Sequence, residues 1–173
     1  LTDLAIFEEG SVFIPTATSG KAFSLPGAAN RPSAEVLNSV LATLPAQPKH
    51  FAALLTGDRV KQQVGVTSQS FDYSDAVSLA ARVVSSTGQE LTVRQGSAKG
   101  YHPGRTAELF VGKSSIGFAG ELAPALAADK DLPRRVAILE IDLDVLYASA
   151  PDVRQASPIF GYPAATQDLS LLV

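Results

Sequence analysis

Two short runs of alternating apolar and polar residues constrain this chain more than any other feature. They occupy residues 107–111 and 115–119 and are joined by Gly112-Lys113-Ser114. Alternation with a period of two is typical of half-buried strands, and a short glycine-containing loop between two such runs is typical of a β-hairpin. His102-Pro103-Gly104-Arg105 precedes the runs and Glu121 follows them. We therefore expect a hairpin with a polar turn sequence before its first strand and a carboxylate after its second strand.

Apolar periodicity predicts further strands and helices on both sides of the hairpin. The expected strands span residues 4–14, with a bulge or close approach at Gly10, and residues 49–56, 90–95 and 136–142. A first helix is expected after Ser33, which serves as its N-cap, a second over residues 72–86 with a stop at Gly88, and a third over residues 124–129. A short helical turn is expected with Asp142 or Asp144 as its cap. Residues 15–32, 58–71 and the HPGR segment are expected to be loops. This order predicts an α+β fold with a mostly antiparallel sheet and helices on one side.

Composition narrows the function classes. Hydrophobic residues make up 46% of the 173 residues and charged residues 18%, which suffices for a packed core. The net charge of −3 argues against a broad electrostatic surface for nucleic acid. The absence of cysteine removes disulfides, thiolate metal ligands and cysteine nucleophiles, and the two histidines are far apart in sequence. No metal site is predicted.

The two ends of the sequence indicate a piece of a longer protein. No methionine is present, and residues 168–173 end on an apolar, strand-like run without a cap or polar tail. An unpaired strand there would be prone to aggregate, so we expect its partners to lie outside this sequence. No signal peptide is recognisable, and no apolar run approaches the roughly 20 residues that span a bilayer, so no membrane contact is expected.

His102 is the natural acid or base candidate, because the histidine pKa is ordinarily near neutrality. Catalysis would need an orienting partner and a nucleophile or metal, and no adjacent residue supplies them. The structural interpretation is favoured: Pro103 presets the backbone, Gly104 permits a positive φ, and Arg105 reaches a carboxylate. Glu121 is the expected partner of Arg105, as an internal ion pair more readily than as a general base.

Other candidate motifs have simpler explanations. Asp142 and Asp144 have the i, i+2 spacing that can ligate a hard cation, but helix capping is favoured because no further acidic cluster accompanies them. Arg134 and Arg135 form a small basic spot. The glycines near the hairpin do not form GxGxxG or a P-loop, and a Gly-x-Ser-x-Gly elbow is absent. The residues alone therefore predict no catalytic residue.

Six segments, taken in order, resemble the β subunit of bacterial phenylalanine–tRNA ligase. They are IFEEGSVF at 6–13, HFAALLTG at 50–57, YHPGRTA at 101–107, GELAP at 120–124, LEIDLD at 139–144 and YPAATQDL at 162–169. The resemblance implies that residues 1–155 are part of a catalytic-like module with the class II synthetase fold. It implies that residues 156–173 begin a truncated ferredoxin-like anticodon-binding domain.

The resemblance also implies a function. The fragment would be a non-catalytic structural module, with His102, Gly104, Arg105 and Glu121 as turn and brace. The α subunit would attach phenylalanine to tRNA(Phe) in a cytoplasmic heterotetramer of two α and two β chains. The whole enzyme would use ATP and Mg²⁺, whereas this fragment would bind no cofactor. The tRNA would be bound through other domains of the β subunit.

Two positions depart from the family pattern, and two other functions stay open. The family commonly has His where Ala123 stands and Arg where Gln167 stands. The first departure weakens the expectation of a histidine site at the hairpin. The second weakens the expectation of a basic contact at the start of the next domain. The alternatives are an independent small-molecule enzyme or binding module using His102, Arg105 and Glu121, and a generic interaction domain, which a strongly apolar exposed sheet face would favour.

Overall fold

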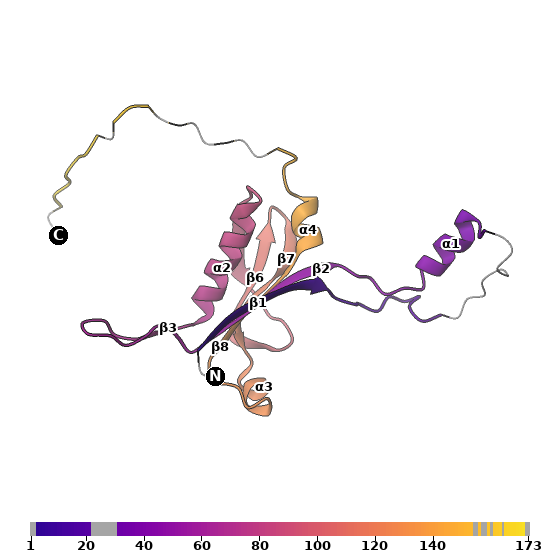
Figure 1. Cartoon of the computed structure of the whole chain (residues 1–173), viewed down its shortest axis with the longest axis horizontal. Helices are drawn as coiled ribbons and strands as arrows, with labels where there is room; N and C mark the ends of the chain where they lie inside the picture. The colour runs from indigo at the N-terminus through magenta and orange to yellow at the C-terminus, as the bar shows by residue number, and fades with distance from the viewer. Residues whose placement is uncertain are drawn as a thin grey trace.

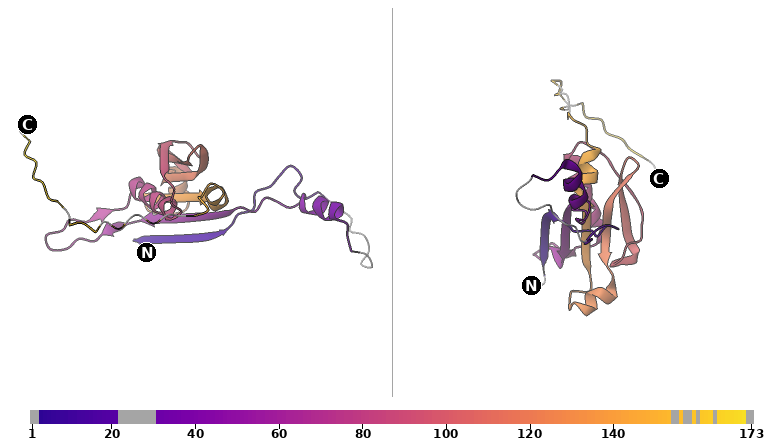
Figure 2. Two further views of the ribbon diagram at one scale, coloured as in Figure 1. Left: turned by 90° about the horizontal axis from the view of Figure 1, so that it is seen from above. Right: turned by 90° about the vertical axis from the view of Figure 1, so that its right-hand side faces the viewer.

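A computed structural model of the chain describes residues 3–21, 31–153, 156, 159, 161–163 and 165–171. Its main element is a six-stranded sheet in the order β1-β2-β8-β7-β6-β5, and every neighbouring pair is antiparallel. The strands are β1 (Leu4–Ser11), β2 (Lys49–Thr56), β5 (Leu91–Gln95), β6 (Tyr101–Val111), β7 (Ser114–Leu122) and β8 (Val136–Asp142). Helices α2 (Tyr73–Ser86) and α4 (Leu143–Ala148) lie on the same side of the sheet (Figures 1 and 2). The expected α+β architecture is confirmed.

The core lies between these two helices and the sheet. Ala76, Ala80 and Val84 follow one another at a spacing of four on α2 and are fully buried. They meet the alternate residues of the central strands that face the helices, including Leu109, Ala119, Leu139 and Ile141, together with Leu143 and Leu146 of α4. Small side chains on α2 let the helix approach the sheet closely, and strands β2, β8, β7 and β6 supply the buried residues on the sheet side of the core.

Helix α2 begins as its sequence predicts. The Asp72 carboxylate accepts hydrogen bonds from the Ser74 backbone N–H at 2.7 Å and its hydroxyl at 2.6 Å. The Asp75 carboxylate accepts a hydrogen bond from the Asp72 backbone N–H at 2.9 Å, which completes a capping box. Gly88 follows the helix with φ of +79° and ends it. Asp142 likewise caps α4 by accepting from the Val145 N–H at 3.0 Å, as expected.

Strands β1 and β2 continue into an arm that carries α1 (Ala34–Leu41) away from the sheet (Figure 1). Ile14 and Ala46 form an isolated antiparallel bridge along the arm. Ser33 caps α1 as predicted, but this helix buries no residue: Leu37 and Leu41 are exposed on it, and Leu44 is exposed just beyond its end. Part of the loop expected at 15–32, residues 22–30, lies outside the described residues.

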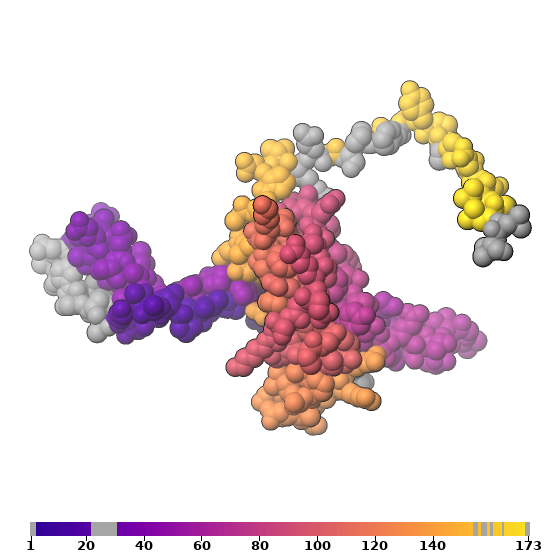
Figure 3. All heavy atoms as spheres, turned by 180° about the vertical axis from the view of Figure 1, so that it is seen from behind, coloured from indigo at the N-terminus to yellow at the C-terminus, as the bar shows by residue number. Residues whose placement is uncertain are grey.

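The expected loop at residues 58–71 is wrong in part. β3 (Asp58–Val60) pairs with β4 (Gln69–Ser70) in a small second sheet. The Ser70 hydroxyl donates to Asp58 at 2.8 Å, and Arg59 donates to Asp75 of α2 at 2.7 Å, which ties β3 to the helix. This segment and the arm project from different sides of the body (Figure 3). Its pairing depends on polar contacts that apolar periodicity does not register.

The HPGR segment is part of strand β6 rather than a loop, so that expectation is also wrong. Gly104 does not have the positive φ expected of a turn glycine, whereas Gly100, just before the strand, has a φ of +89°. The β6–β7 register shifts between Tyr101 and Thr106, where Pro103 has no N–H to donate. The bulge at Gly10 is not observed either, because the β1–β2 register is regular there and no atom lies within 4 Å of a Cβ built on it.

The expected hairpin is present as β6 and β7, with Gly112 in the turn at φ of +58°. α3 (Pro124–Asp129) follows at the end of the sheet, and its bounds match the expectation. The described part of residues 168–173, up to residue 171, has no strand, and Leu169 and Leu171 are exposed. Within the described residues, no helix has both the length and the apolar character to cross a membrane.

Candidate functional site

Arg105 and Glu121 are brought together by the pairing of β6 with β7. Arg105 donates from Nε to a carboxylate oxygen of Glu121 at 2.7 Å. The Glu121 side chain is 4% exposed and that of Arg105 38% exposed. Glu121 lies opposite Ala137 of β8, on the face of the sheet that α2 covers. A carboxylate at this depth needs a charged or hydrogen-bonding partner, and Arg105 provides it.

His102 and Gly104 contact each other rather than the ion pair. The Gly104 backbone N–H donates to Nδ1 of His102 at 3.0 Å, and the Thr106 hydroxyl donates to the His102 carbonyl oxygen. The imidazole therefore accepts through Nδ1, which places the proton of a neutral ring on Nε2. These bonds fix the irregular start of β6. The structure thus gathers the four predicted residues into two separate pairs.

A pocket of about 480 Å³ lies between the first turn of α2 and strands β5 and β6. Gly104, Arg105 and Thr106 border it from β6, and Ser74 and Ser78 from α2. Neither His102 nor Glu121 is among its lining residues. A guanidinium and several hydroxyl-bearing side chains line the pocket, but His102, the candidate base, is not among them.

A second polar cluster, which sequence reasoning missed, joins β2 to β8 on the face opposite the helices. His50 Nδ1 lies 2.7 Å from a carboxylate oxygen of Glu140, and Nε2 lies 3.8 Å from Asp142. Nε2 is buried and has no hydrogen-bond partner among the residues that the structure describes. His50 and Asp142 are register partners across the two strands. Both strands were expected with the observed bounds, so a correct pairing register would have revealed the cluster.

The described residues do not form a site that fits a divalent cation. No group of three or more His, Asp or Glu side chains within them is arranged to hold a metal ion. Asp142 caps α4, and Asp144 accepts from the Lys49 backbone N–H at 3.2 Å. The two carboxylates at i, i+2 are therefore engaged with backbone groups and do not converge.

Tyr101 lies on the same open side as the histidine cluster. Its hydroxyl donates to the Phe118 carbonyl oxygen at 3.3 Å, and its ring packs at 6.1 Å from the Phe118 ring. Burial raises the pKa of Tyr101 well above its ordinary value, and the negative charge of Glu140 raises it further. The phenol is accordingly a hydrogen-bond donor rather than a base at neutral pH.

The part of the sequence that runs from β1 through β8 matches one known domain family. The sequence profile described as the phenylalanyl tRNA synthetase beta chain CLM domain matches residues 1–143. The chain belongs to the phenylalanyl-tRNA synthetase beta chain family. The predicted resemblance is confirmed.

Individual relatives of this family match nearly the whole chain. The phenylalanine–tRNA ligase beta subunit of Leifsonia xyli subsp. xyli is 44% identical over 100% of this chain and 21% of its own length. Those of Streptomyces avermitilis and Cutibacterium acnes are 39% and 37% identical over 99% of this chain and 21% and 20% of their own lengths. The chain spans about a fifth of the length of the beta subunits it matches.

The two positions that depart from the family pattern have simple surroundings. Ala123 precedes α3 as its N-cap residue without a side-chain bond, and its backbone N–H donates to the Gly100 carbonyl oxygen at 2.8 Å. Gln167 is exposed in the described part of the C-terminal segment. Neither position contributes a side chain to the Arg105–Glu121 pair.

Proposed function

We propose that this chain is a non-catalytic structural module of a phenylalanine–tRNA ligase β subunit, and that His102, Gly104, Arg105 and Glu121 brace its fold. Family membership supports the assignment, and the Arg105–Glu121 ion pair supports the structural role most directly. A buried carboxylate bonded to a guanidinium at 2.7 Å serves the fold and is not poised to abstract a proton.

The proposal extends to the complete enzyme. The catalytic site would be held by an α subunit, which attaches phenylalanine to tRNA(Phe) with ATP and Mg²⁺ in the cytoplasm. The assembly would contain two α and two β chains, with tRNA bound by other β domains. ATP and Mg²⁺ would act in the rest of the enzyme, at the site that the α subunit holds.

We also propose the finer assignment of the fold. Residues 1–155 form a catalytic-like module related to class II synthetases, and residues 156–173 begin a ferredoxin-like anticodon-binding domain. The antiparallel sheet with its helices on one side supports the first assignment. The family profile ends at residue 143, ahead of the proposed boundary.

Two measurements test the function. Calorimetric titration of this chain with ATP, in the presence of Mg²⁺, and separately with phenylalanine should give no saturable heat at micromolar concentrations. Co-expression with the α subunit of the same organism should retain the chain on a tagged α subunit. Micromolar binding of either ligand would overturn the non-catalytic role, and failure to associate with the α subunit would overturn the supporting role.

The small-molecule alternative makes a different prediction. It requires His102 to act beside Arg105, and the pocket bordered by Arg105 is the observation in its favour. Under this alternative, His102→Ala would abolish a measurable activity or binding event while the fold stays intact. Under the structural proposal, the same substitution changes only the stability of the start of β6.

The interaction-domain alternative has a stronger basis in the structure. Ile6 is 54% exposed on β1, and it shares the open face of the sheet with its register partners Leu54 and Ile138. Such a face is typical of a protein-binding surface. It is compatible with a module of a larger assembly.

A further inference from the structure

The two faces of the sheet are covered unequally. α2 and α4 both pack against one face, whereas α3 lies at the end of the sheet (Figures 1 and 2). The other face carries the row Ile6–Leu54–Ile138, whose members are register partners across the edge strand β1 and the next two strands, β2 and β8. Within the described residues no helix packs across this row. An apolar row at the surface is costly unless another molecule covers it.

This row forms the floor of a pocket of about 450 Å³. Tyr101, Leu122 and Leu126 add further apolar lining from β6, β7 and α3. On the β1 side the floor is open, because Ile6 is 54% exposed. Pockets for small ligands bury most of the ligand surface, which a pocket open along one strand does not do. A polypeptide segment, which supplies part of the wall itself, fits this shape better.

The charges beside the floor are mainly negative. Glu8, Ala52 and Glu140 are register partners in the next row of the same face, so the two carboxylates flank a small side chain. Because adjacent strands lie about 4.8 Å apart, their backbones are separated by roughly 10 Å, with room for one cationic group between them. Glu8 makes no ion pair or side-chain hydrogen bond in the described part of the chain.

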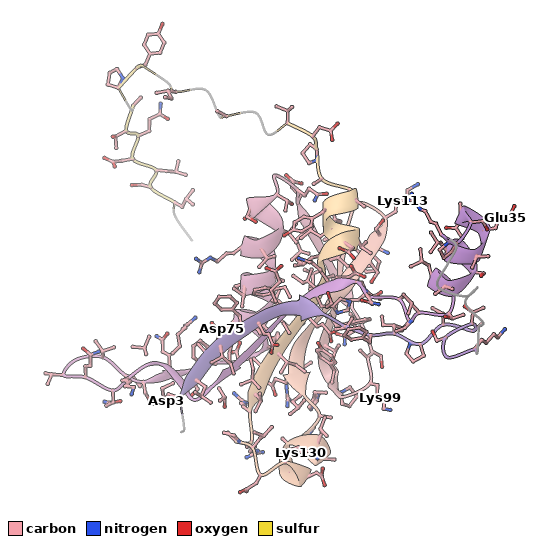
Figure 4. The ribbon with its side chains drawn as sticks, turned by 45° about the vertical axis from the view of Figure 1, so that its right-hand side comes forward. Asp3, Glu35, Asp75, Lys99, Lys113 and Lys130 are labelled. Carbon is pink, nitrogen blue, oxygen red and sulfur yellow. The ribbon has the colours of Figure 1, made fainter. Side chains whose placement is uncertain are left out.

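Two further groups complete the electrostatics of the pocket. His50 bonds to Glu140 from the side away from the floor. Lys99 lines the pocket from the loop before β6 (Figure 4) and makes no ion pair with the described residues. The lining thus holds two carboxylates near β1 and β8 and one ammonium group near β6. Phosphate groups would be repelled from the carboxylate side, which disfavours nucleic acid.

We infer that the open face of the sheet binds a segment of another polypeptide that places an aliphatic side chain over Ile6, Leu54 and Ile138 and an Arg or Lys between Glu8 and Glu140. The aliphatic group supplies the affinity by covering the floor, and the basic group fixes orientation. The inference goes beyond the proposed function, because it holds whether or not the chain works in a synthetase.

A nuclear magnetic resonance titration of the isotopically labelled chain tests this inference. The probes are acetylated, amidated Ser-Arg-Leu-Arg-Ser, its acidic twin Ser-Glu-Leu-Glu-Ser, and Ser-Arg-Gly-Arg-Ser, which lacks the anchor. The first peptide should shift the backbone amides of Ala52, Leu54 and Ile138 at millimolar concentration, and the other two should bind at least about threefold more weakly.

Adjacent glutamates on β1 provide a matched pair of variants. Glu8 faces the pocket, and Glu9 lies one residue further along the strand and faces the other side. Glu8→Gln should weaken binding of the basic peptide about threefold, and Glu8→Gln with Glu140→Gln about tenfold. Glu9→Gln should leave binding unchanged.

Several results would overturn the inference. They are no shift of the three amides, equal binding of the acidic or the glycine peptide, equal effects of the two β1 glutamates, or larger shifts with free phenylalanine, ATP or an RNA oligonucleotide. Failure of these peptides to bind would leave association with the α subunit untouched, so the two proposals fail separately.

Discussion

The ion pair between Arg105 and Glu121 joins a buried anion to a cation that reaches solvent. Their atoms are 2.7 Å apart, with the Glu121 side chain 4% exposed and that of Arg105 38% exposed. Removing one partner therefore has a different consequence from removing the other. Without Arg105, a carboxylate is left unpaired in the interior, whereas without the charge of Glu121, the guanidinium can turn toward water.

The first prediction follows from this asymmetry. Arg105→Met should lower the free energy of unfolding by about 3 kcal/mol, and Glu121→Gln by about 1 kcal/mol, in urea titrations at neutral pH. The double variant should be more stable than Arg105→Met alone, because it no longer buries a charge. Equal losses for the two single variants would show that the pair does not brace the hairpin in this way.

Gly117 supports a second prediction, because the backbone of β8 passes directly over it. A Cβ built on Gly117 would lie 2.0 Å from the carbonyl oxygen of Glu140, and its φ is +148°. Gly117→Ala should therefore cost more than about 3 kcal/mol, since a backbone atom must shift and the conformation is strained.

Gly10 is the control for this prediction. No atom lies within 4 Å of a Cβ built on Gly10, which is also in a strand. Gly10→Ala should be neutral or stabilise the fold by up to about 1 kcal/mol, and thermal unfolding of the two variants measures both changes. A similar loss for both substitutions would mean that the close approach at Gly117 is absent in solution.

The third prediction concerns acid stability. The Ser74 hydroxyl that donates to Asp72, together with backbone N–H groups at the start of α2, lowers the pKa of Asp72 below its ordinary value. A carboxyl whose pKa is lower when folded stabilises the protein at pH values above its unfolded pKa of about 3.9. That contribution is lost as the pH falls through the folded pKa.

Asp72→Ala should accordingly lower the free energy of unfolding by about 1 kcal/mol at pH 7. Its difference from the unmodified chain should shrink at pH values below about 3.9, where the carboxyl is increasingly protonated. Asp129→Ala, at an exposed carboxylate near the end of α3, should show little effect at either pH. A difference for Asp72→Ala that stays constant across this range would rule out the charged cap.

Most strands and helices of the fold could be predicted from local sequence patterns. β2, β8 and α3 have the bounds expected from apolar periodicity, caps and flanking glycines or prolines, because those signals act within a few residues. Strands β3 and β4 were not predicted, because these two short polar strands are stabilised by contacts of Arg59 and Ser70 that form only in the folded chain. Pro103 and Gly104 indicated a turn, but they continue β6 between Tyr101 and Thr106, which both pair with β7.

The same distinction applies to the candidate site. Arg105 and Glu121 flank one hairpin, so their approach follows from a pairing that is local in sequence. His50, Glu140 and Asp142 come from strands about 90 residues apart, and only the β2–β8 register brings them together. A one-residue slip in that register would place their side chains on opposite faces, which is why sequence patterns did not reveal the cluster.

The last prediction separates the arm from the sheet. Leu139 is 2% exposed at the centre of the core, whereas Leu41 of α1 is 60% exposed on the arm. Leu139→Ala should lower the free energy of unfolding by about 3 kcal/mol, because it leaves a cavity beneath α2. Leu41→Ala should change it by less than about 0.5 kcal/mol, because its side chain is already in water. Paired urea titrations measure both values, and a large loss for Leu41→Ala would show that α1 packs against the body of the isolated chain.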